Sequence, residues 1–201
     1  MKQITNFIKE GLKINSKTRV NEKAYHPKNR EELVKLVDEL MIERGDEANL
    51  NDIDTSNITD MRSLFENTNF NGNISKWDVS NVKDMSSMFY KCPFNGDISK
   101  WDVGKVEYMD LMFGHCKFNG DISEWNVSKV INMSSMFWCS PFNGDISNWD
   151  VSNVTNMYCM FYESKFKGDI NKWDVSNVKK MGGIFLGCPL EDNPPKWYDG
   201  I

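Results

Sequence analysis

Tryptophan recurs every 24 residues along most of this 201-residue chain, with no insertion or deletion between copies. Methionine, phenylalanine and glycine keep the same step, and one unit reads W-D-V-S-N-V-x-x-M-S-S-M-F-x-x-C-x-F-N-G-D-I-S-x. The tryptophans of the series are Trp77, Trp101, Trp125, Trp149, Trp173 and Trp197. A period of about 20 to 50 residues is typical of stacked coils, because one unit cannot bury its apolar face alone. We therefore expect repeated coils whose Trp, Phe, Met and Val columns fill the interior.

The apolar spacing within a unit predicts the local structure of one coil. Residues 98–106 alternate partly between β-branched and polar side chains, which favours a short strand. Residues 109–113 place apolar side chains at i, i+3 and i+4, which favours a short helix. Residues 118–121, Phe-Asn-Gly-Asp, predict a turn in which the glycine is available for a positive φ and the Asn or Asp side chain can bond its own backbone. The expected fold class is an α/β repeat solenoid of about six 24-residue coils, each built of strand, helix and turn.

The units resemble a known repeat family. FNGNISKWDVSNVKDMSSMFYKC at 70–92 and FNGDISNWDVSNVTNMYCMFYES at 142–164 resemble the BspA-type leucine-rich repeats of bacterial surface proteins and mycoplasma lipoproteins. The resemblance covers about residues 50–198. It implies a leucine-rich-repeat-like stack and a role in adhesion or protein interaction, with no catalytic residues to transfer.

The two ends of the array differ from the units between them. Residues 1–50 are expected to form an N-terminal cap and residues 51–201 the repeat domain. In the cap, Asn29 and Glu32 predict the start of an amphipathic helix and Gly45 its end. A shorter helix is expected at 4–12 and an extended segment at 13–20. Two prolines, at 194 and 195, forbid a continuing ladder and end the array.

Composition limits the classes of binding partner and the cellular compartment that we expect. A formal charge of −5 disfavours nucleic acid, whose binding needs clustered Lys and Arg. No segment reaches the roughly 20 apolar residues of a membrane span, so no membrane partner is expected. Five cysteines, an odd number without close pairs, favour a reducing compartment. We expect a cytoplasmic protein, or a cell-surface protein if a leader was removed.

Few residues form a pattern suited to catalysis. His26 and His115 are far apart in sequence, and Cys116, adjacent to His115, would not face it. Cys139 and Cys159, which break the cysteine register, are expected to be accessible. Two acid columns could bind Ca²⁺, but capping of their own turns is favoured, because N-G-D is an ordinary turn sequence. These columns are Asp97, Asp121, Asp145 and Asp169, and Asp78, Asp102, Asp150 and Asp174. Neither catalysis, a metal nor a cofactor is therefore expected.

Positions where one coil departs from the others are the candidate binding residues. If the Met and Phe columns point inward, several of the departing residues point outward and could form an interaction hot spot. The alternative is that some of them, Trp138 and Tyr162 above all, pack over neighbouring coils. The candidates for partner binding are Tyr90, Tyr108, Leu111, Ile131, Trp138, Tyr158 and Tyr162.

The function expected from these features is a non-enzymatic protein–protein interaction module inside a bacterium or a phage-infected cell. One alternative is a surface adhesin for host protein or glycan, which needs an export signal. Another is a β-solenoid enzyme acting on polysaccharide, which needs acids that do not recur in every coil. The sequence predicts a protein partner but names neither the partner nor the oligomeric state.

Overall fold

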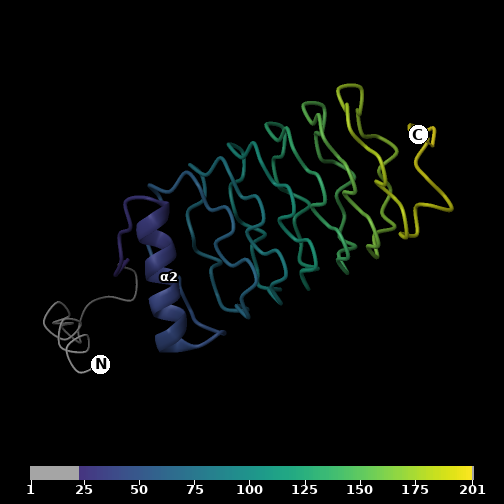
Figure 1. Ribbon diagram of the computed structural model, residues 1–201. Coiled ribbons are helices and arrows are strands. Elements are labelled where there is room, and N and C mark those ends of the chain that lie inside the picture. The colour runs from purple at the N-terminus through teal and green to yellow at the C-terminus, as the bar shows by residue number, and fades with distance from the viewer. Residues whose placement is uncertain (1–22, 201) are drawn as a thin grey trace, which may run out of the picture.

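The computed structural model describes residues 23–200. Within that range one α-helix, α2 (Arg30–Arg44), is followed by coils that lie side by side in a single row (Figure 1). The helix lies across the first coil, at the purple end of the row, and the last coils form the yellow end (Figure 1). The helix expected at 4–12 and the segment at 13–20 lie outside the described residues.

The predicted class, an α/β repeat solenoid with a strand and a helix in every coil, is wrong. Over residues 23–200 the only helix is α2, and the β-structure is limited to isolated parallel bridges, with no sheet. Five of these bridges join residues 24 apart in one series that runs from Asp60 to Lys180. The strand expected at 98–106 is irregular backbone with two short turns, and most of the helix expected at 109–113 is a run of turns.

Apolar residues three apart produce the periodicity that suggested strand and helix, but here each such pair closes a turn. The backbone N–H of Trp101 donates to the carbonyl of Ile98 at 3.1 Å, and that of Met112 donates to Met109 at 3.3 Å. The same bond recurs at the equivalent positions of the other central coils. A spacing of three residues is shared by turns and helices, so the pattern alone could not separate them.

Hydrogen bonds between coils prevent the second half of each unit from becoming a helix. The backbone N–H groups of residues 109, 111, 113 and 115 donate to carbonyl groups of the next coil, at 2.7 to 3.0 Å. In an α-helix these groups would donate four residues back along the chain. Every second N–H therefore points along the stack, and the backbone itself joins successive coils.

Left-handed backbone makes this arrangement possible. Leu111 and His115 have φ values of 58° and 52°, and the equivalent residues of the neighbouring coils are also left-handed. Glycine occupies both positions in the last coil, at Gly183 and Gly187. Left-handed backbone costs an ordinary residue about 1 to 2 kcal/mol, and the hydrogen bonds between coils offset that cost.

Residues 118–121, Phe-Asn-Gly-Asp, do not form the predicted turn, and the glycine serves a different purpose from the predicted one. The repeated glycines, such as Gly96, are absent from the positive-φ residues of the described chain. A Cβ added at Gly96 would instead lie 2.8 Å from the ring of Phe94. The expectation of a positive φ here is therefore wrong, and the glycine is required because the phenylalanine ring packs against the backbone.

The interior consists of columns that run the length of the stack. The tryptophans from Trp77 to Trp173 are each 4% exposed. Each indole N–H donates to the carbonyl of the residue 27 positions earlier, at 2.9 to 3.3 Å. Two phenylalanine columns lie beside them, and the rings of Phe113 and Phe118 are 4.3 Å apart. The sequence prediction that these aromatic columns are internal is confirmed.

An asparagine column on the exterior adds a further ladder. The backbone N–H groups of residues 95, 119, 143 and 167 each donate to the side-chain oxygen of an asparagine 24 positions earlier, at 2.8 to 2.9 Å. The acceptors are Asn71, Asn95, Asn119 and Asn143. The ladder satisfies backbone donors at the Phe-Asn-Gly corner, where each coil has no bridge.

Helix α2 begins and ends where the sequence predicts. The Asn29 side chain accepts a hydrogen bond from the backbone N–H of Glu32 at 3.0 Å, and Gly45 ends the helix with φ of 82°. The Glu32 carboxylate reaches back to the backbone N–H of Lys28 at 2.9 Å. Leu33 and Val37 are fully buried in the same core as the repeats. The helix therefore covers apolar surface of the first coil.

Candidate functional site

The seven predicted binding residues separate into two groups. Tyr90, Leu111, Trp138 and Tyr162 lie beside the left-handed turns, and each is half-buried. Tyr108, Ile131 and Tyr158 lie on the side that carries the series of bridges. We call this side the bridge face, and define it by its bridge residues and the residues within two positions of them in each coil. The bridge residues are Asp60, Asp84, Tyr108, Asn132, Asn156 and Lys180.

The first group packs together rather than standing free. Tyr90 and Trp138 belong to coils two repeats apart, yet their ring centroids are 6.5 Å apart, because buried Gly114 lies between them in the stack. A Cβ at Gly114 would lie 3.1 Å from the Tyr90 ring. Trp138 also contacts His115 and Tyr162, with centroids 4.7 and 6.3 Å away. Trp138 therefore covers neighbouring coils, as the packing alternative predicts.

The second group is more exposed and borders a groove. Tyr158 is 54% exposed and Tyr108 is 38% exposed, which makes them two of the four exposed large apolar side chains among residues 23–200. A groove of about 270 Å³ runs across four coils, from Tyr108 to Lys180. The groove is lined by Tyr108, Ile131, Asn132, Thr155, Asn156, Lys179 and Lys180. The backbone N–H of Tyr158 donates to the side chain of Asn156, which places Tyr158 next to this lining.

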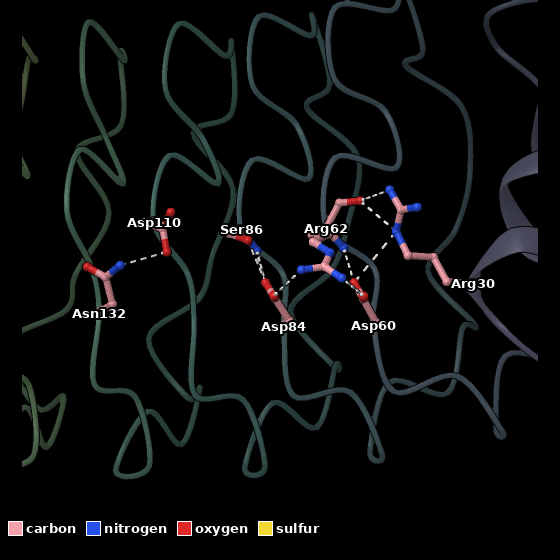
Figure 2. A network of polar contacts seen from close by, with 7 residues as sticks. All are labelled: Arg30, Asp60, Arg62, Asp84, Ser86, Asp110 and Asn132. Atoms are coloured by element: carbon pink, nitrogen blue, oxygen red, sulfur yellow. Dashed lines mark hydrogen bonds and ion pairs between the residues drawn. The ribbon is translucent and has the colours of Figure 1, made fainter.

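Charged side chains occupy the other half of the bridge face. Arg62 contacts the carboxylates of Asp60 at 2.9 Å and Asp84 at 3.9 Å. Arg30 of α2 lies 3.6 Å from Asp60 and donates to the Arg62 carbonyl at 2.7 Å. Figure 2 shows the row, in which Arg62 lies between the two aspartates and Arg30 reaches in from the helix. The acids of the first coils are thus neutralised within the chain.

Asp110 marks the boundary between the two halves. Its carboxylate accepts a hydrogen bond from the Asn132 side chain at 2.8 Å, as Figure 2 shows. Burial, followed by the nearby Asp84 carboxylate, raises the pKa of Asp110 above its ordinary value. Other central coils have a serine at this position, Ser86 and Ser134. Asp110 is therefore a carboxyl group whose charged form is disfavoured by its surroundings, at a position where other coils have serine.

The acid columns away from the bridge face cap their own turns, as the sequence predicts. Asp97 accepts from the backbone N–H of Ser99 at 3.0 Å, and Asp121 accepts from Ser123 at 3.0 Å. These bonds lower the pKa of both carboxyl groups. Over residues 23–200, no three His, Cys, Asp or Glu side chains come together in a way that could hold a metal ion.

The cysteines follow the pattern expected from their register. Cys92, Cys116 and Cys188 are buried, and burial raises the pKa of Cys116 to about 12. Cys139 and Cys159 are half-buried, in agreement with their expected accessibility. The Cys139 thiol donates to the Glu163 carboxylate at 3.1 Å. Burial and this carboxylate raise the pKa of Cys139 to about 11, so the thiol stays protonated at neutral pH and is a poor nucleophile.

Sequence reasoning missed the polar part of the groove. Lys179 and Lys180 occupy the two variable positions before the methionine of their coil, and they were not recognised because lysine is an ordinary surface residue. Asparagine recurs at the position of Asn156 in the stack, so nothing in the sequence marked Asn156 as a binding residue. The bridge register could have identified these residues, since it places them beside Tyr108 and Ile131 on one face.

The chain belongs to a family described as Mycoplasma protein of unknown function, DUF285, which matches residues 36–140 and again 114–197. The two overlapping matches reflect the internal repeat. No curated protein and no solved structure matches the chain. Among the helices of the described residues, none is long and apolar enough to span a membrane.

Proposed function

We propose that this protein is a non-enzymatic interaction module that binds another protein through the C-terminal half of the bridge face. The observation that carries the proposal is the groove, which has exposed Tyr108 in its lining and exposed Tyr158 two residues beyond Asn156 of that lining. Tyrosines at the edge of a groove are typical of binding hot spots, because a large rigid ring buries much area at little entropic cost.

Several features support a binding role over a catalytic one. The acidic side chains recur from coil to coil. Those at Asp97, Asp121, Asp145 and Asp169 each accept a hydrogen bond from a backbone N–H two residues further along the chain. Cys139 is held protonated beside Glu163. The resemblance to BspA-type repeats also supports a role in protein interaction. Under this proposal residues 1–50 act as a cap and residues 51–201 supply the binding surface, and the five free cysteines favour the cytoplasm.

The structure sharpens the choice of residues for a test. Trp138 packs on Tyr90, His115 and Tyr162, and its indole N–H is buried without a hydrogen-bond partner. Replacing it would disturb the stack as well as the surface. Tyr158 packs only lightly, over Gly182 of the next coil, and is the better probe.

The proposal is tested by placing a photo-crosslinking phenylalanine analogue at position 158, and in a separate variant at position 108. We expect both variants to form a crosslink to the same protein in a lysate of the producing organism. The matched control carries the analogue at Ile42, which is 87% exposed on α2, away from the groove. The same adduct from Ile42, or adducts from none of the three, would contradict the proposal. A Tyr158→Ser variant with an unchanged melting transition should lose the partner.

A further inference from the structure

We propose that the groove binds an extended peptide segment of the partner that carries a carboxylate beside an aromatic or aliphatic side chain. This inference rests on the proposed function and names the chemistry of the partner at the same site. The charges of the bridge face, the groove lining and the exposed tyrosines together define this peptide.

The two lysines at the C-terminal edge of the groove supply the positive charge. Lys179 and Lys180 are both exposed and both line the groove. Every ion pair formed within residues 23–200 uses His26, Arg30, Lys35, Arg44 or Arg62, all at the N-terminal end. In the preceding coil the equivalent residues are the neutral Thr155 and Asn156. A carboxylate delivered by a partner would therefore meet two cations without displacing an internal one.

The N-terminal edge of the groove has the opposite character. Glu107 is adjacent to Tyr108, and Asp110 follows on the same face. A uniform polyanion such as a nucleic acid would place phosphates against these acids as well as against the lysines. A peptide can instead set an acidic residue at one end and a neutral or basic residue at the other. The positive charge at one edge of the groove and the negative charge at the other thus favour a peptide, and they set the direction in which it lies across the groove.

Between the charged edges the groove offers apolar contact and amide donors. Ile131 and Tyr108 contribute apolar lining. The Asn156 side-chain oxygen already accepts from the Tyr158 backbone at 3.1 Å, which leaves its amide N–H groups as donors. An apolar side chain of the peptide fits against Ile131 while its neighbouring carboxylate reaches the lysines and the Asn156 amide.

The test is a selection of random peptides displayed on phage against the full chain. We expect the selected peptides to be enriched in Asp or Glu beside Phe, Tyr or Leu. A synthetic copy of the leading peptide should lose affinity at least about tenfold with the double variant Lys179→Glu, Lys180→Glu, and weaken as salt is raised. Ile42→Ser, the control, should bind as the parent chain does.

Three outcomes separate this inference from the proposed function. Peptides that need Tyr158 but show no acidic preference and no dependence on the lysines would overturn the inference and leave the interaction module standing. A selection that yields no peptide sensitive to Tyr158→Ser would overturn both. Binding of single-stranded oligothymidylate at the affinity of the leading peptide, competed by that peptide, would also overturn the inference, since it would show that the acids do not repel a polyanion.

Discussion

The two halves of the bridge face share one backbone and differ in how their charges are used. In the first coils Arg30, Asp60, Arg62 and Asp84 form a row in which each charge contacts another (Figure 2). In the later coils the same columns carry exposed Tyr108, Tyr158 and lysines, around a groove. Because both halves rest on the same interior, the repeated columns form the core and the variable columns carry the residues of the proposed binding site.

The largest expected effect comes from the interior that both halves share. Trp125, 4% exposed, lies at the middle of the stack and donates to the Ile98 carbonyl at 3.2 Å. We expect Trp125→Ala to lower the free energy of unfolding by about 3 to 5 kcal/mol, because it leaves a cavity and removes one of the two hydrogen bonds to the Ile98 carbonyl. Urea denaturation measures this loss. Trp125→Phe, which retains most of the volume, should cost less, and a cost of Trp125→Ala no larger than that of Tyr158→Ala would contradict the assignment of stability to the columns.

A smaller effect should separate the two halves directly. Arg62→Ala removes the contacts with Asp60 and Asp84, and because its side chain is 58% exposed we expect a loss of only about 0.5 to 1 kcal/mol. Lys180→Ala removes a cation that forms no ion pair within residues 23–200, and should leave stability unchanged. Thermal unfolding at low and high salt compares the two variants. Equal losses of stability in Arg62→Ala and Lys180→Ala would contradict the distinction between the two halves of the bridge face.

The smallest effect concerns the boundary between the halves. Burial and Asp84 raise the pKa of Asp110 in the folded chain above its unfolded value, so the contribution of this carboxyl to stability is present at acid pH and lost as the pH rises through the folded pKa. We therefore expect Asp110→Asn to raise the melting temperature at about pH 7, and the gain to shrink towards about pH 4. The substituted amide still accepts from Asn132.

The control for this measurement is Ser134→Asn, which changes the same column one coil later without a titrating group. Its effect on the melting temperature should not vary over the same pH range. A gain from Asp110→Asn that stays constant with pH would mean that the carboxylate is not destabilising, and would place the effect in packing.

Prediction from sequence was correct for the positions that repeat. It was wrong where hydrogen bonding decides whether a segment forms turns or forms a strand or helix. The 24-residue step identified the buried tryptophans, and the Asn29 and Gly45 signals placed the ends of α2. The strand and helix of each coil were wrong, because residues three apart close turns as readily as they line a helix. The role of Gly96 was wrong for a related reason, since its contact with Phe94 follows from ring packing.

The candidate site shows the same division. The departures from the consensus named Tyr108, Ile131 and Tyr158, which the structure brings to the groove side. They named Trp138 in the same way, and only the structure shows it covering Gly114 with Tyr90. Nothing in the sequence singled out Lys179 and Lys180, and only their position beside the groove makes them candidate binding residues.

By itself the sequence determined the register of the coils and most of the residues they bury, because a 24-residue period admits only one alignment that keeps the tryptophans of the series in one column. The tertiary structure decided the backbone of each coil and the composition of the groove. Both depend on what the next coil offers: its carbonyl groups draw the backbone N–H groups along the stack, and its side chains complete a surface that no single repeat contains.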